Sequence, residues 1–144
     1  MARIVFETDV AADAATIVEA LTTRDGIAGW WTDDVQLEGG EGATMRLGFP
    51  IAPVPFELVI EGAAADQVMW RSTGEFPPHW VDTTVTWTLR PGDGGTTKVH
   101  FNHDGWASDE GPFPMSAYTW GQLFGRLADH AQSGTVAPLF TRSS

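Results

Sequence analysis

Residues 81–103 read VDTTVTWTLRPGDGGTTKVHFNH, which is the clearest structural signal in the chain. Over 81–89 apolar side chains alternate with threonines, and over 96–103 they alternate with polar residues, as in strands that bury one face. Between these runs, 90–95 is rich in glycine and proline and favours a tight turn. We therefore predict a β-hairpin whose apolar face needs a cover.

Shorter runs of the same alternation lie before this hairpin and predict five more strands. Consecutive strands joined by short turns pair in antiparallel fashion, so we expect one antiparallel sheet. The five predicted strands are 3–8, 35–38, 43–49, 56–61 and 67–73.

Three segments have helical periodicity. Two short helices, 14–22 and 27–31, are predicted after the first strand, with residues 24–26 as a break between them. A long helix is predicted from about Ser116 to Ser133, followed by Gly134 as its stop. At about 1.5 Å per residue this helix spans roughly 27 Å, enough to cross the sheet. The order of elements predicts a single α+β domain over 1–144, in which the sheet wraps around the last helix and encloses an apolar cavity.

Three segments resemble a known family. They are IVEALT (17–22) followed by GWWT (29–32), TKVHFNHDGW (97–106), and WGQLFGRL (120–127) with Gly134 and Pro138 after it. With these segments the chain resembles the START/Bet v 1-like (SRPBCC) superfamily, and within it the family named for the activator of Hsp90 ATPase, which is grouped with polyketide cyclases.

The resemblance covers nearly the whole chain and implies a helix-grip (Bet v 1-like) fold. In that fold a seven-stranded antiparallel sheet grips the C-terminal helix, with a pocket between them. It implies no obligatory metal or organic cofactor. Members of the family carry lipids, cyclise substrates or stimulate a chaperone, so the family indicates a cavity and does not indicate one reaction.

Charge and composition exclude several classes of function. The formal net charge is −11, from 19 acidic and 8 basic residues. Such a field repels phosphate backbones and anionic lipid surfaces, so neither nucleic acid nor a membrane is an expected partner. The chain has no cysteine and no apolar run long enough for a signal peptide or a membrane span. We expect a cytoplasmic protein, and its oligomeric state stays open.

The first functional hypothesis is that the cavity binds a small apolar or amphipathic molecule. Seven tryptophans are many for this length, and large aromatic residues line ligand cavities. The alternative is that the indoles only fill the core. We predict that the cavity is lined by Trp30, Met45, Leu47, Phe56, Leu58, Trp70, Trp87, Phe101, His103, Trp120 and Phe124. Trp31 is adjacent to Trp30, and the two are not expected to be buried in the same way.

The second hypothesis is a cyclase- or hydrolase-type enzyme that uses the same cavity. It requires a polar group inside a dry site, and the weak candidates are His103 with Tyr118. The alternative for His103 is a structural histidine at the end of a strand. His100 lies on the opposite face of that strand, so no metal site is predicted. A chaperone-stimulating role is a third hypothesis, and only the family name suggests it.

Residues 74–80 read GEFPPHW, a loop with two bulky aromatic side chains. We predict that Phe76 and Trp80 close one end of the cavity as a lid, with simple packing on the core as the alternative. Arg71 is expected to face solvent if Val68 and Trp70 face inward. In the opposite register it would be buried and would imply an anionic ligand.

Overall fold

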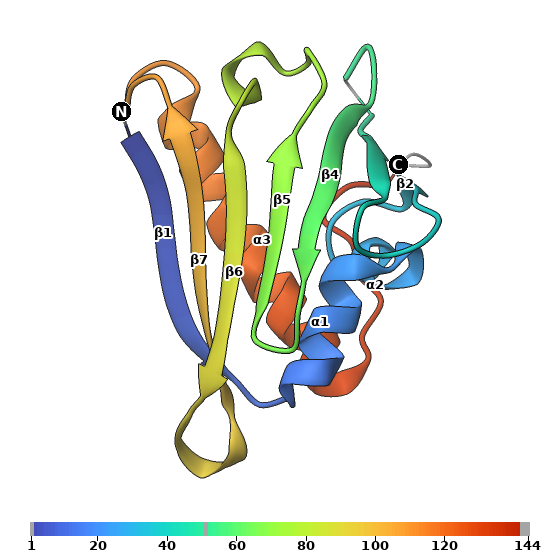
Figure 1. The fold of residues 1–144 in the computed structure, drawn as a ribbon, viewed down its shortest axis with the longest axis vertical. Helices are drawn as coiled ribbons and strands as arrows, with labels where there is room; N and C mark the ends of the chain where they lie inside the picture. Colours follow the sequence, from blue (N-terminus) through green and yellow to red (C-terminus); the bar gives the residue numbers. More distant parts are fainter. Residues whose placement is uncertain (1, 51, 142–144) are drawn as a thin grey trace.

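The computed structural model describes residues 2–50 and 52–141. Its sheet has seven antiparallel strands in the order β1-β7-β6-β5-β4-β3-β2, so the chain begins at one edge and returns beside itself through β7 (Figure 1). The predicted α+β class and the seven-stranded antiparallel sheet are confirmed. The strands are β1 (Ala2–Val10), β2 (Asp34–Gln36), β3 (Thr44–Gly48), β4 (Phe56–Ala63), β5 (Gln67–Ser72), β6 (Thr84–Pro91) and β7 (Thr97–Trp106).

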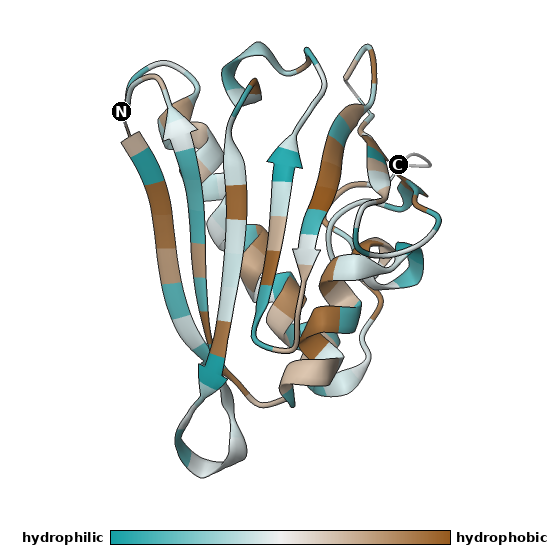
Figure 2. Ribbon diagram, viewed as in Figure 1, coloured by the Kyte–Doolittle hydropathy of each residue, from teal (hydrophilic) through white to brown (hydrophobic). Residues whose placement is uncertain are grey.

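The β6–β7 hairpin has the register that its alternation predicts. Trp87 lies opposite Phe101, and Val85 lies opposite His103. All four side chains are buried on the inner face of the sheet. In Figure 2 hydrophobic and more polar residues alternate along β6, as expected for a strand that buries one face, whereas β1 and β4 carry longer hydrophobic runs.

The long helix α3 (Phe113–Ser133) crosses the inner face of the sheet (Figure 1). Its buried stripe, from Trp120 to Ala131, follows helical spacing. It ends at Gly134 (φ 73°), as predicted, because glycine adopts the left-handed conformation without strain. It begins before the predicted Ser116, since Pro114 is tolerated in the first turn, where its missing N–H would have no partner.

The short helices differ from the prediction in one place. The first, α1 (Ala14–Thr22), has the predicted bounds, whereas α2 spans Arg24–Ala28 and includes the predicted break. It begins there because the Thr23 side chain accepts a hydrogen bond from the Gly26 N–H and caps the helix. The two indoles that follow, at 30 and 31, are both buried with ring centroids 5.5 Å apart, so the expectation that they differ was wrong. The helix ends before them, and helical spacing does not separate their side chains.

Several strand boundaries also differ from the prediction, most of all the start of β6 and the end of β7. A 3₁₀ turn, η1 (Pro78–Trp80), precedes β6, which therefore begins at Thr84 and not at residue 81. In contrast, β7 continues past His103 to Trp106. No helix in the described ranges is both long and apolar enough to span a membrane.

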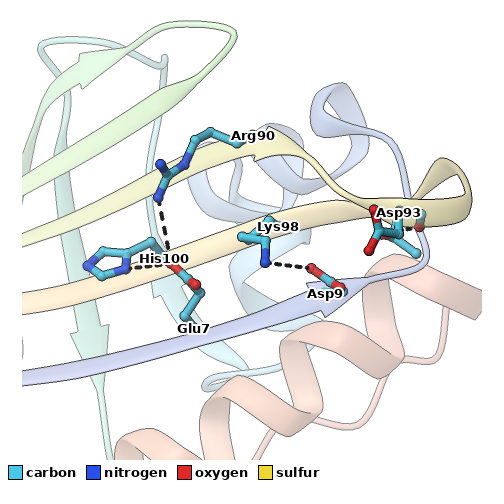
Figure 3. A network of polar contacts seen from close by, with 7 residues as sticks. Glu7, Asp9, Arg90, Asp93, Lys98 and His100 are labelled. Atoms are coloured by element: carbon cyan, nitrogen blue, oxygen red, sulfur yellow. Dashed lines mark hydrogen bonds and ion pairs between the residues drawn. The ribbon is translucent and has the colours of Figure 1, made fainter.

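The outer face of the sheet carries charged side chains. Arg71 faces this side and pairs with Glu61 at 3.1 Å, while its neighbours in β5 are buried, so the predicted register is confirmed. His100 Nδ1 lies 3.0 Å from Glu7 Oε2, within the network of polar contacts shown in Figure 3. The hydrogen bond with His100 holds the pKa of Glu7 below its usual value. Exposed pairs of this kind contribute little to stability.

Candidate functional site

A cavity of about 390 Å³ lies between the first half of α3, residues 76–80 and the C-terminal tail. This volume is within the usual range for small-molecule sites. The side chains around it are mostly aromatic or aliphatic. They are Trp31, Phe49, Ala52, Phe56, Phe76, Pro77, His79, Trp80, Pro112, Met115, Ser116, Thr119, Trp120, Leu123 and Phe140.

Four of the side chains predicted to line a cavity do so: Phe56, Phe76, Trp80 and Trp120. The others lie deeper, in the core on the inner face of the sheet. They are Trp30, Met45, Leu47, Leu58, Trp70, Trp87, Phe101, His103 and Phe124. Alternation along a strand identifies the inner face, but the opposing elements decide which part of that face meets a cavity. In this fold the indoles fill the middle of that face, and the cavity is displaced toward the start of α3.

Trp31 lies at the centre of the aromatic wall, although the sequence did not single it out as a lining residue. Its ring centroid is 5.1 Å from that of Trp120, 5.7 Å from Trp70 and 6.3 Å from Trp80. The indole ring of Trp80 is nearly parallel to that of Trp120, with 13° between their planes. Trp31, Trp80 and Trp120 all line the cavity.

A chain of buried hydrogen bonds holds two of these indoles in place. The Trp120 indole N–H donates to His103 Nδ1 at 3.1 Å. The proton of the neutral ring therefore lies on Nε2, which donates to Thr83 Oγ1 at 2.9 Å. The Thr83 hydroxyl then donates to the backbone carbonyl of Trp80 at 2.6 Å. His103 thus connects the sheet to α3 and, through Thr83, to the segment that precedes β6.

Burial keeps His103 uncharged. Desolvation, with a smaller contribution from nearby His79, lowers the pKa of His103 from its usual value to about 3. Protonation would also require Nδ1 to lose the hydrogen bond from Trp120, because that atom would carry a proton itself. With both ring nitrogens occupied, His103 is placed to position side chains and not to exchange protons with a cavity ligand.

The two candidate catalytic residues are not brought together. Tyr118 lies on an outward face of α3, where its side chain is 64% exposed. Its hydroxyl accepts a hydrogen bond from Gln122 Nε2 at 3.4 Å. His103, in contrast, is fully buried and is not among the residues around the cavity.

The tail after α3 forms another wall of the cavity, and the sequence contains no local signal for this. Residues 137–140 run beside 29–33, with backbone hydrogen bonds from Leu139 N to Trp30 O (3.1 Å) and from Phe140 N to Trp31 O (3.0 Å). The ring of Phe140 then contacts Phe49, with 5.1 Å between centroids. The pairing joins residues more than a hundred positions apart, so no local pattern predicts it.

Truncating Phe140 is expected to open this wall. Because the side chain is only half-buried, Phe140→Ala is expected to lower the free energy of unfolding by about 1–2 kcal/mol, less than a fully buried phenylalanine would. The affinity for an apolar ligand should fall by roughly tenfold as aromatic contact is lost. Urea unfolding and fluorescence titration measure the two effects. Val136→Ala, at a 71% exposed position in the same tail, is the control and should change neither.

Within the described residues, no group of three or more histidine and carboxylate side chains is placed to hold a metal ion. His79, the one ionisable side chain among the described residues that line the cavity, is separated from His100 by the sheet and from His130 by the length of α3.

Comparison with known proteins gives a family and a set of related folds. The family profile described as "Activator of Hsp90 ATPase homolog 1-like protein" matches residues 11–132. Among curated protein sequences, none is significantly similar to the chain. The solution structure of the Aha1 dimer from Colwellia psychrerythraea is similar with a TM-score of 0.83 and 25% identity, over 93% of this chain and 98% of that one.

Two further structures share the fold at lower identity. One is DynU16, a putative protein in the dynemicin biosynthetic locus, with a TM-score of 0.73 and 21% identity over 97% of this chain and 51% of that one. The other is protein BH1534 of Bacillus halodurans, with a TM-score of 0.72 and 17% identity over 91% of this chain and 97% of that one. At these identities the likeness concerns the fold alone.

Proposed function

Because the chain belongs to the family of activator of Hsp90 ATPase homolog 1-like proteins, we propose that it binds a small, largely apolar molecule between the sheet and α3. The observation that carries this proposal is the cavity of about 390 Å³ with mostly aromatic walls. Burial of a ligand's apolar surface against such walls is the main source of its affinity.

Binding is favoured over catalysis because of the state of His103. A general acid or base must reach the reacting group of its substrate and have a pKa near the working pH. His103 instead has both ring nitrogens bonded to protein groups, and burial lowers its pKa to about 3. Neither this residue nor exposed Tyr118 supports the cyclase or hydrolase hypothesis, and the chaperone-stimulating role rests on the family alone.

The proposal is tested by titrating uncharged polycyclic aromatic compounds while tryptophan fluorescence is recorded. Trp31, Trp80 and Trp120 line the cavity, so a bound ligand should quench a large part of the emission. A ligand present at a hundred times its Kd should also add about 2.7 kcal/mol to the free energy of unfolding. If a broad panel changes neither fluorescence nor melting temperature, the proposal is wrong.

The lid hypothesis leads to a specific expectation for Phe76, which is half-buried and has its ring centroid 5.6 Å from that of Phe56. Phe76→Ala should weaken ligand binding by about five- to tenfold, and it should lower the free energy of unfolding by less than about 1.5 kcal/mol. Equilibrium titration and urea unfolding measure these effects. Val54→Ala, in an exposed apolar position outside the cavity, is the matched control.

Trp80 is expected to behave differently from Phe76. It is 6% exposed and contacts His103, with 4.8 Å between ring centroids. Trp80→Ala should therefore reduce both stability and affinity. If Phe76→Ala lowered stability strongly and left binding unchanged, residue 76 would be a core residue and the lid hypothesis would fail.

A further inference from the structure

We propose that the ligand is an uncharged, flat aromatic molecule with one hydrogen-bonding group, and that His79 and Ser116 recognise this group. The inference rests on the proposed function, since it names the chemical class that the same cavity would accept. Three features of the cavity carry it: the aromatic character of its walls, the absence of charged side chains among the described residues that line it, and the position of two polar side chains.

The walls are built mainly from planar rings. They are the indoles of Trp31, Trp80 and Trp120 together with several phenylalanine rings, of which those of Phe49 and Phe56 have centroids 4.5 Å apart. Aromatic pairs in offset or edge-to-face contact gain free energy beyond that of apolar burial. The rings that line the cavity can make such contacts with an aromatic ligand, and a flexible alkyl chain cannot.

The charge of the cavity disfavours ionised ligands. Among the described residues that line it, none is Lys, Arg, Asp or Glu. A carboxylate or an ammonium group that entered would lose its hydration without gaining a partner of opposite charge, which is costly. The formal net charge of −11 adds a field that repels anions.

Two polar side chains lie at the end of the cavity near the start of α3. His79 stacks on Trp106 at 5.3 Å between ring centroids, and Trp106 in turn contacts Phe113, the first residue of α3. Ser116 follows Phe113 by three positions, so the two lie on neighbouring parts of the same helix face. Both His79 and Ser116 line the cavity.

These two side chains have hydrogen-bonding capacity to offer a ligand. Within the described ranges, neither the ring nitrogens of His79 nor the Ser116 hydroxyl makes a hydrogen bond with the protein, whereas the Thr119 hydroxyl donates to the Met115 carbonyl at 2.9 Å. Burial lowers the pKa of His79, so its ring is neutral at pH 7. A neutral imidazole and a hydroxyl each provide a donor and an acceptor, which suits a phenol or a ketone.

The experiment compares four probes with the same three-ring body: phenanthrene, a phenanthrol, a phenanthrene carboxylate and an aminomethylphenanthrene. Each is titrated at pH 7.5 with tryptophan fluorescence as the readout. The phenanthrol, which is uncharged at this pH, should bind about tenfold more tightly than phenanthrene, as expected for one or two net hydrogen bonds. The anionic and cationic probes should bind more weakly than the phenanthrol.

Variants of His79 and Ser116 test whether these two side chains cause the preference for the phenanthrol. His79→Phe and Ser116→Ala should each reduce the preference for the phenanthrol over phenanthrene by about threefold, and the double variant should abolish it. The preference is a ratio of two affinities, so a change in apolar contact that affects both probes equally cancels. Ser133→Ala removes a hydroxyl from the other end of α3, where it bonds to the Asp129 carbonyl, and is the matched control.

The outcomes separate this inference from the proposed function. If phenanthrene binds as tightly as the phenanthrol, or if the double variant keeps the preference, recognition by His79 and Ser116 is refuted and the proposed function stands. If the carboxylate or the ammonium probe binds at least as tightly as the phenanthrol, the uncharged class is refuted. If none of the four probes binds while another apolar compound of the broad panel does, this inference fails and the proposed function stands; if nothing in either set binds, both fail.

Discussion

Lowering the pH from 7 to 4 is expected to remove about 3 kcal/mol from the free energy of unfolding through His103 alone. In the unfolded chain this side chain has an ordinary pKa of about 6.5. In the folded protein burial lowers the pKa to about 3. Between about pH 3 and about pH 6.5 the unfolded state binds a proton at this residue that the folded state does not bind. The free energy of unfolding therefore falls as the pH falls through this range. The contribution is fully present above about pH 6.5.

Urea unfolding at several pH values between 7 and 4 measures this effect, with His103→Gln as the comparison. At pH 7 the variant should be less stable, because Trp120 Nε1 and Thr83 lose a buried partner. The difference between the two proteins should shrink as the pH falls, since only the wild type carries the titrating group. The lowered pKa values of Glu7 and Asp13 also make the protein less stable in acid, but they are common to both proteins and cancel. Parallel pH profiles would contradict the assignment.

Replacing Trp31 is expected to have the other large effect. The residue is 2% exposed, and its ring contacts the rings of four other indoles that line the cavity or the core beside it. Trp31→Ala should lower the free energy of unfolding by about 3–5 kcal/mol, because it leaves a large void that its rigid neighbours cannot fill. It should also abolish detectable binding of an apolar ligand, since Trp31 lines the cavity.

The neighbouring residue Trp30 is the matched control. It is equally buried, and its indole N–H donates to the Ala20 carbonyl at 2.9 Å, but it does not line the cavity. Trp30→Ala should therefore cost a similar amount of stability. The milder pair Trp30→Phe and Trp31→Phe, which should both fold, allows binding to be compared. Equal losses of affinity in these two variants would show that the effect of Trp31 is only structural.

Some features of the candidate site could be predicted from the sequence, and others could not. Phe56 and Trp120 were expected to line the cavity because each follows the period of its own strand or helix. Trp87 and Phe101 follow the same rule and are buried as expected, yet they lie in the core. Periodicity identifies which face of an element is covered, but it contains no information on what covers it.

The sequence by itself determined the succession of strands and helices along the chain, the inward face of the sheet and the stop of the long helix, because these depend on alternation, turn residues and a glycine, which act locally. Only the tertiary structure decided that the tail brings Phe140 to the cavity and that Trp31 lies at its centre. It also decided that His103 is held neutral between Trp120 and Thr83. Each of these results comes from pairing and desolvation between elements far apart in the chain, and such interactions exist only once the sheet has closed around α3.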